Sequence, residues 1–122
     1  MPYRVLILDD DRHVSESLAM QLDDEGFMTS QAHSAEDALR LLEDEPCDIV
    51  IVDLRLPGMN GIDFINAASR GWGKLRFIIY TGSPEFHIPN SMNSMESVSE
   101  ALFLKPLSDY ATLISEIRNM LD

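Results

Sequence analysis

Residues 48–61 read DIVIVDLRLPGMNG and contain the clearest strand signal in the chain. The run Ile49–Val52 is wholly apolar and β-branched, which is typical of a strand buried on both faces of a parallel sheet. Asp53 follows this run at once, and turn-forming residues from Pro57 to Gly61 come next. We therefore predict a buried strand that presents a carboxylate at its carboxyl end and then leaves the sheet through a turn.

Four further strands are predicted around this one. Val5–Leu8 and Phe77–Tyr80 are equally apolar, while Phe27–Ala32 and Ala101–Leu104 give weaker signals. Apolar residues at helical spacing occur between the strands, in Val14–Leu22, Ala35–Leu42, Ile62–Ser69 and Leu113–Leu121. Strands that alternate with helices from end to end predict a single α/β domain over residues 1–122, with a doubly wound parallel sheet and helices on both faces.

The charge balance limits the classes of partner. Asp and Glu number 21 against 9 Lys and Arg, which gives a formal net charge of -12. Such a charge opposes binding to nucleic-acid phosphates and anionic membranes, so we expect no direct nucleic-acid partner. No apolar run approaches the length of a membrane span, and the amino terminus lacks the pattern of a signal peptide, so we expect a cytoplasmic protein. The single Cys47 rules out an internal disulfide.

Polar residues follow the predicted strands at the point where each strand ends. The acidic run Asp9–Asp11 follows the first strand, Asp53 the third, Thr81 the fourth and Lys105 the fifth. Each has a local explanation on its own, since an acidic residue caps helices and Asp or Thr starts turns. Because the carboxyl ends of parallel strands meet at one edge, where ligands bind in such sheets, their combination favours a functional site.

The chemistry of these side chains indicates phosphoryl transfer. Carboxylates a few Å apart repel one another by about 4 kcal/mol per pair near a protein surface, so the arrangement needs a cation. Oxygen ligands without nearby His or Cys suit Mg²⁺. A lysine adds a fixed positive charge, and phosphoryl transfer requires little beyond a nucleophile, charge neutralisation and positioning.

Four segments of the chain resemble response-regulator receiver domains, and together they span nearly its whole length. These segments are Leu6–Asp11, Asp48–Gly61, Ile79–Gly82 and Phe103–Pro106. The resemblance implies a flavodoxin-like five-stranded parallel sheet in the order 2-1-3-4-5, with five helices. It also implies a role in a two-component phosphorelay rather than that of an enzyme acting on an external metabolite.

The resemblance assigns the nucleophile and the metal ligands. By this resemblance Asp53 is the phosphoacceptor, which receives a phosphoryl group from a phosphohistidine of a partner protein. Asp9 and Asp10 form the acidic pair that holds Mg²⁺, together with Asp53 and the main-chain carbonyl of Arg55. The partner would be a sensor histidine kinase or a histidine phosphotransfer protein, and a separate output protein would read the phosphorylated state.

Further roles follow from the same resemblance. Thr81 corresponds to the switch hydroxyl that turns towards the phosphoryl group, and Lys105 to the lysine that pairs with it. The peptide bond before Pro106 is expected to be cis, and Gly61 to form the tight turn that opens the third helix. A receiver of this kind assists its own phosphorylation and dephosphorylation, and a phosphorylation-dependent dimer is among the outcomes that the resemblance allows.

The chain departs from the family pattern in three places. Leu102 stands where receivers commonly have an aromatic residue, which puts the usual relay from threonine to aromatic in question. The segment between Thr81 and Lys105 contains Pro84 and Pro89, so its helix is expected to be short, displaced or mobile. Arg55 occupies a position that influences hydrolysis of the acyl phosphate.

Two other functions are compatible with part of this residue pattern. A haloacid-dehalogenase-type phosphohydrolase shares an Asp-x-Asp motif, a hydroxyl and a lysine, but needs a further acidic motif after Lys105. A degenerate receiver that serves only as an interaction module is a second alternative. Met92, Met95 and Val98 fit either a partner surface or a helix that covers the sheet. Trp72 is expected to pack against its own domain.

Overall fold

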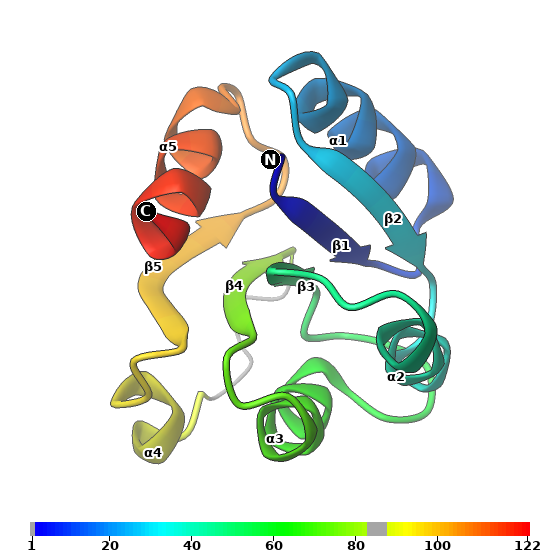
Figure 1. Ribbon diagram of the computed structural model, residues 1–122, viewed down its shortest axis with the longest axis vertical. Helices are drawn as coiled ribbons and strands as arrows, with labels where there is room; N and C mark the ends of the chain where they lie inside the picture. The colour runs from blue at the N-terminus through cyan, green and yellow to red at the C-terminus, as the bar shows by residue number, and fades with distance from the viewer. Residues whose placement is uncertain (1, 83–87) are drawn as a thin grey trace.

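The computed structural model of the protein describes residues 2–82 and 88–122, so Pro84 and the other residues of 83–87 lie outside the described part. It contains one parallel sheet of five strands in the order β2-β1-β3-β4-β5 (Figure 1). The strands are β1 (Arg4–Leu8), β2 (Met28–Ala32), β3 (Ile49–Val52), β4 (Arg76–Thr81) and β5 (Val98–Leu104). This is the strand order that the family resemblance implied.

Helices cover both faces of the sheet (Figure 1). They are α1 (Arg12–Asp24), α2 (Ala35–Asp44), α3 (Gly61–Gly71), α4 (Asn90–Asn93) and α5 (Ala111–Leu121). The core accordingly divides into two clusters of buried residues, one with α2 and α3 and the other with α1 and α5. No described helix is long and apolar enough to cross a membrane.

The central strand β3 has its side chains in both core clusters. Val50 and Val52 pack in the cluster with α2 and α3, while Ile49 and Ile51 pack in the cluster with α1 and α5. Successive side chains of a strand point to opposite faces, so a strand that lies between two helical layers must be apolar at every position.

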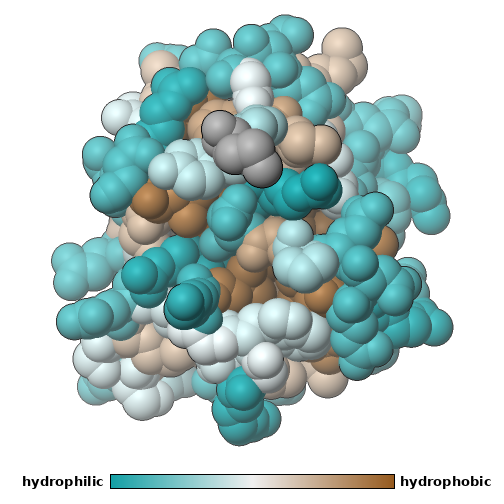
Figure 2. All heavy atoms as spheres, viewed as in Figure 1, coloured by the Kyte–Doolittle hydropathy of each residue, from teal (hydrophilic) through white to brown (hydrophobic). Residues whose placement is uncertain are grey.

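On the face seen in Figure 2, hydrophilic residues form most of the surface and apolar residues show mainly in the hollows.

The fourth connection differs most from the predicted pattern. Helix α4 is a single short turn, as the two prolines suggested, and strand β5 begins at Val98 rather than at Ala101. Met92 and Val98 are buried against the sheet, so the reading of these residues as a partner surface is wrong. Val98 belongs to β5, where it pairs with Phe77 of β4.

Strand β5 is irregular near its start. The pairing register with β4 shifts between Phe77 and Ile79, and Ser99 Oγ accepts a hydrogen bond of 3.1 Å from the backbone N–H of Ala101. Ser99 Oγ also donates a hydrogen bond to Glu116 of α5. Further along the strand, Leu102 and Leu104 are 44% and 45% exposed.

Candidate functional site

The ends of four strands bring Asp9, Asp53, Thr81 and Lys105 to the carboxyl edge of the sheet. Asp9 follows β1, Asp53 follows β3, Thr81 ends β4 and Lys105 follows β5. Asp9, Asp53 and Thr81 are buried although each is polar, and the side chain of Lys105 is only 16% exposed. Buried polar groups require hydrogen-bond partners, and these residues are partners for one another.

Both carboxylate oxygens of Asp53 accept hydrogen bonds. Oδ1 accepts one of 2.9 Å from Thr81 Oγ1 and a longer one of 3.3 Å from the backbone N–H of Arg55. Oδ2 accepts one of 3.0 Å from Lys105 Nζ. The carboxylate is therefore held between a hydroxyl and an ammonium group.

Lys105 bridges the two buried carboxylates, because its Nζ also donates to Asp9 Oδ2. Burial raises the pKa of Asp9 and outweighs the lowering effect of the hydrogen bond from Lys105. Burial alone would lower the pKa of Lys105, but its hydrogen bonds and charge interactions with Asp9 and Asp53 outweigh that effect and raise it. The ammonium group stays charged and compensates two buried carboxylates.

The three predicted acidic ligands fit Mg²⁺. One carboxylate oxygen from each of Asp9, Asp10 and Asp53 lies within 4.8 Å of the others. Carboxylate oxygens are the ligands that Mg²⁺ prefers, so these three residues would hold the ion together. Asp9 Oδ1 accepts a hydrogen bond of 2.9 Å from the backbone N–H of Asp11, which orients the buried ligand. The role of the Arg55 carbonyl stays a prediction.

Asp11 is the residue of the acidic run that caps the first helix. The side chain of Asp11 accepts hydrogen bonds from the backbone N–H groups of His13 and Val14 at the start of α1. Since the cap needs only one carboxylate, the exposed Asp10 remains available at the mouth of the site.

Gly61 is required by the close approach of two backbones. A Cβ atom at this position would lie 2.3 Å from the carbonyl oxygen of Asp53, and Gly61 N–H donates a 2.9 Å hydrogen bond to the carbonyl of Leu54. Helix α3 begins at Gly61, so the predicted position of this glycine at the start of the third helix is confirmed. The peptide bond between Lys105 and Pro106 is cis, as predicted.

Two contacts of the site were not predicted from the sequence. The ring of Tyr80 lies 5.4 Å from Lys105 Nζ, at cation–π distance. The backbone N–H of Arg55 points at the Asp53 carboxylate. For the contact with Lys105, the only signal in the sequence was the aromatic residue Tyr80 one position before Thr81. The contact from Arg55 uses its backbone N–H, which every residue except proline has, so the residue type gives no signal for it.

The histidines take no part in a described metal cluster. His33 Nε2 lies 3.3 Å from Ser15 Oγ, and His13 is exposed in the first turn of α1. His87 falls outside the described residues. Within residues 2–82 and 88–122, the metal-binding geometry is limited to the three aspartates.

Comparison with known proteins identifies the family. The sequence pattern of the response regulator receiver domain matches residues 5–118 of this chain. The DNA-binding response regulator MtrA of Mycobacterium tuberculosis is 43% identical over 63 residues, which cover 52% of this chain and 28% of that protein. The transcriptional regulatory protein CpxR of Escherichia coli is 41% identical over 64 residues, covering 52% of this chain and 27% of that protein. The chain thus matches about a quarter of the length of these relatives.

Solved structures share the fold. A receiver domain protein of Methanospirillum hungatei superimposes with a TM-score of 0.86 at 28% identity, covering 100% of this chain and 95% of that one. The response regulator TrrA of Thermotoga maritima, solved in complex with Mg²⁺ and BeF, superimposes with a TM-score of 0.82 at 22% identity, covering 99% of this chain and 100% of that one.

Proposed function

Since this chain belongs to the family of response regulator receiver domains, we propose that its Asp53 carboxylate accepts a phosphoryl group from a phosphohistidine of a partner protein. The observation that carries the proposal is the set of contacts around Asp53. Thr81 and Lys105 donate to its two carboxylate oxygens, while Asp9 and Asp10 lie close enough to share a cation with it.

The transfer is a single displacement at phosphorus. One oxygen of the Asp53 carboxylate attacks the phosphorus atom, the bond from phosphorus to the imidazole nitrogen of the donor breaks, and its electron pair stays on that nitrogen. The product is an acyl phosphate on Asp53. Hydrolysis returns the carboxylate when water attacks phosphorus and the bond to the Asp53 oxygen breaks, which releases inorganic phosphate.

Residues of the chain compensate the charge that moves in this reaction. Mg²⁺, held by Asp9, Asp10 and Asp53, would neutralise part of the charge on the phosphoryl oxygens. Lys105 already lies 3.0 Å from Asp53 Oδ2, and Thr81 Oγ1 lies 2.9 Å from Oδ1. A phosphoryl group brings roughly -1.5 to -2 charges and three strong acceptors, so both donors turn to its oxygens after transfer.

The partners follow from this chemistry. The donor is a sensor histidine kinase or a histidine phosphotransfer protein, and an output partner binds differently to the phosphorylated form. The matched relatives are described as DNA-binding and transcriptional regulators, but the match covers only about a quarter of each. We also propose that this phosphotransfer takes place in the cytoplasm.

The direct test is phosphorylation by acetyl phosphate with Mg²⁺, followed by intact mass. We expect one base-labile phosphoryl group on the parent and none on Asp53→Asn. Equal labelling of the variant would refute the assigned nucleophile. Release of phosphate from a generic phosphomonoester at many turnovers would instead indicate the phosphohydrolase.

The switch is tested by hydrogen exchange with and without beryllofluoride. Leu102 has no planar ring to move between buried and exposed positions, so we expect the response to appear at Thr81, at Lys105 and in the segment between them, including residues 85–100. Protection that changes around Thr81 and Lys105 but nowhere in 85–100 would contradict this readout.

A further inference from the structure

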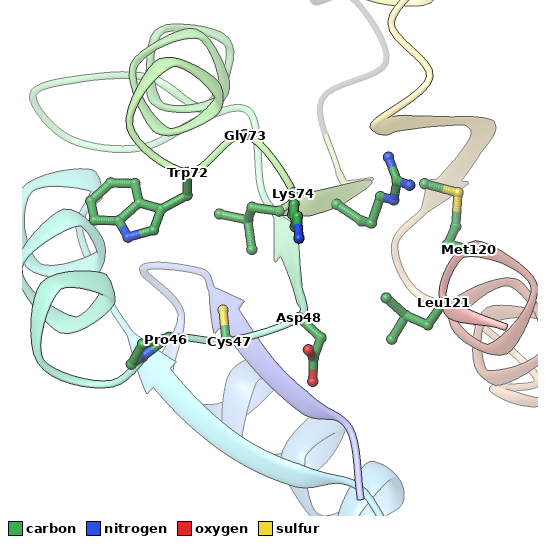
Figure 3. Close-up of a pocket in the computed structure, with 10 residues that line it drawn as sticks. Pro46, Cys47, Asp48, Trp72, Gly73, Lys74, Met120 and Leu121 are labelled. Carbon is green, nitrogen blue, oxygen red and sulfur yellow. The ribbon is translucent and has the colours of Figure 1, made fainter. Parts of the chain in front are cut away.

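A second cavity lies at the amino edge of the sheet, opposite Asp53. Its volume is about 470 Å³, and its walls come from the connection before β3, the connection before β4 and the end of α5 (Figure 3). We refer to this feature, lined by residues 46–48, 72–76, 120 and 121, as the amino-edge cavity. None of its residues belongs to the site around Asp53.

Apolar side chains form two sides of the amino-edge cavity. Figure 3 shows Trp72 on one side and Met120 and Leu121 on the other. Trp72 packs against the core cluster of α2 and α3, whereas Met120 and Leu121 pack against the cluster of α1 and α5. An added Cβ at Gly73 would meet no atom within 4 Å, so the approach beside the indole is open.

The two cations at this cavity, Lys74 and Arg76, form no ion pair within the described part of the chain. The carboxylate of Asp48, on the same wall, accepts a 2.8 Å hydrogen bond from the backbone N–H of Arg4. In a chain with 21 acidic and 9 basic residues, the lining of this cavity has two cations against the single carboxylate of Asp48, and it is therefore a local region of opposite charge.

We propose that the amino-edge cavity binds a segment of a partner polypeptide in which acidic residues flank a large apolar side chain. The apolar side chain would lie between Trp72 and Met120, and the carboxylates would pair with Lys74 and Arg76. A polypeptide suits the cavity better than a small metabolite does. Sites for small molecules enclose most of the ligand, whereas Pro46, Asp48, Gly73 and Lys74 are exposed at this wide mouth.

The location makes this binding independent of phosphorylation chemistry. Strand β3 separates Asp48 from Asp53, and its four residues span about 13 Å at the usual rise of a strand. A segment in the amino-edge cavity therefore leaves the carboxyl edge open to a phosphodonor. The proposal does not rest on the function assigned to Asp53. Peptide binding at the amino-edge cavity and phosphorylation of Asp53 are tested by different experiments, so either one can be refuted without the other.

The test uses acetylated, amidated hexapeptides with a central Phe-Leu and Asp or Glu on both sides. Control peptides carry Asn and Gln in place of the acids. Binding is followed by NMR of the ¹⁵N-labelled protein, at the Trp72 indole N–H and the amides of Gly73 and Lys74, and by fluorescence of Trp72, the only tryptophan. We expect saturable shifts at these positions with the acidic set and little shift at Asp53 or Thr81.

Charge reversal supplies matched variants. Lys74→Glu and Arg76→Glu should each weaken binding of the acidic peptides by about tenfold. Arg40→Glu makes the same change in net charge on α2, where Arg40 pairs with Asp37, and should leave the affinity unchanged. Because both cavity cations lack described partners, neither reversal removes an ion pair that holds the fold.

Three results would overturn the proposal. The first is absence of saturable binding by the whole acidic set. The second is equal binding of the Asn and Gln peptides, or equal affinity in Lys74→Glu, Arg76→Glu and the parent. The third is saturation of the same signals by benzoate at the affinity of the peptides, which would indicate a site for small organic anions instead.

Discussion

The two edges of this sheet carry the same kinds of charged side chain in different states. At the carboxyl edge, Lys105 is held between the buried carboxylates of Asp9 and Asp53. At the amino edge, Lys74 and Arg76 have no ion pair within the described part of the chain. Side chains that directly follow buried strands leave water and must find partners, whereas the exposed Lys74 and the half-buried Arg76 at the start of β4 remain in contact with solvent. The degree of burial therefore determines whether a charged side chain at either edge forms an ion pair.

The largest expected difference concerns the two nucleophilic groups. Asp53 has donors on both oxygens, whereas burial raises the pKa of Cys47 at the amino edge to about 12. The thiolate is the form that reacts with iodoacetamide, and at about pH 8.5 much less of it is present in the native protein than in the urea-unfolded protein. We therefore expect the native thiol to react several hundredfold more slowly. Intact mass against time measures both rates. Similar rates in the two states would mean that Cys47 is not desolvated.

The next difference concerns glycines at the two edges. Gly61→Ala places a Cβ 2.3 Å from the carbonyl oxygen of Asp53, and we expect a loss of about 3 kcal/mol in the free energy of unfolding. Gly71→Ala, at the end of α3, meets no atom within 4 Å and should change it by less than about 1 kcal/mol. Urea denaturation gives both values. Equal costs would contradict the close approach at Gly61.

The third difference concerns a single buried hydroxyl group. Thr81 is fully buried and donates to Asp53 Oδ1, so Thr81→Val should lower the free energy of unfolding by about 1 to 2 kcal/mol. Thr112→Val on the exposed surface of α5 should have an effect below about 0.5 kcal/mol. The parent and both variants are compared by urea denaturation. A neutral Thr81→Val would show that the bond to Asp53 adds nothing to stability.

The smallest effect concerns an exposed carboxylate. Asp10→Asn should weaken Mg²⁺ binding by about tenfold, as calorimetry would record. Without metal, relief of repulsion with Asp9 and Asp53 should leave stability equal or raise it by up to about 1 kcal/mol. Asp44→Asn, at the exposed end of α2, is the control and should leave Mg²⁺ affinity unchanged. Unaltered affinity in Asp10→Asn would remove Asp10 from the ligand set.

The sequence predicted the fold well where side-chain pattern alone determines structure. The apolar runs of β1, β3 and β4 located the central strands, and the polar residues after them located the carboxyl-edge site. The sequence predicted the start of β5 too late, at Ala101, because Ser99 and Glu100 interrupt the apolar pattern of the strand. In the structure these residues belong to β5, where its pairing with β4 is irregular. Such a pairing depends on the neighbouring strand as well as on β5, so the sequence of β5 alone does not predict it.

Contacts between distant segments could not be predicted in the same way. The pairing of Lys105 with both Asp9 and Asp53 joins residues 96 and 52 positions apart. The amino-edge cavity is assembled from the connections before β3 and β4 and the end of α5, and none of these segments carries a motif. Sequence spacing predicts which residues reach an edge, but their distances from one another depend on how the layers pack.

The irregular start of β5 has a consequence for solubility. Strand β5 lies at the margin of the sheet, and Leu102 and Leu104 are exposed along it. A straight strand of this composition would be a template onto which a neighbouring molecule adds its own strand, the first step towards fibrils. The register shift interrupts the row of main-chain groups, and Ser99 takes up the N–H of Ala101 within the same chain. We therefore expect the irregular start of β5 to make this margin a poorer template for strand addition than a regular strand of the same composition would be.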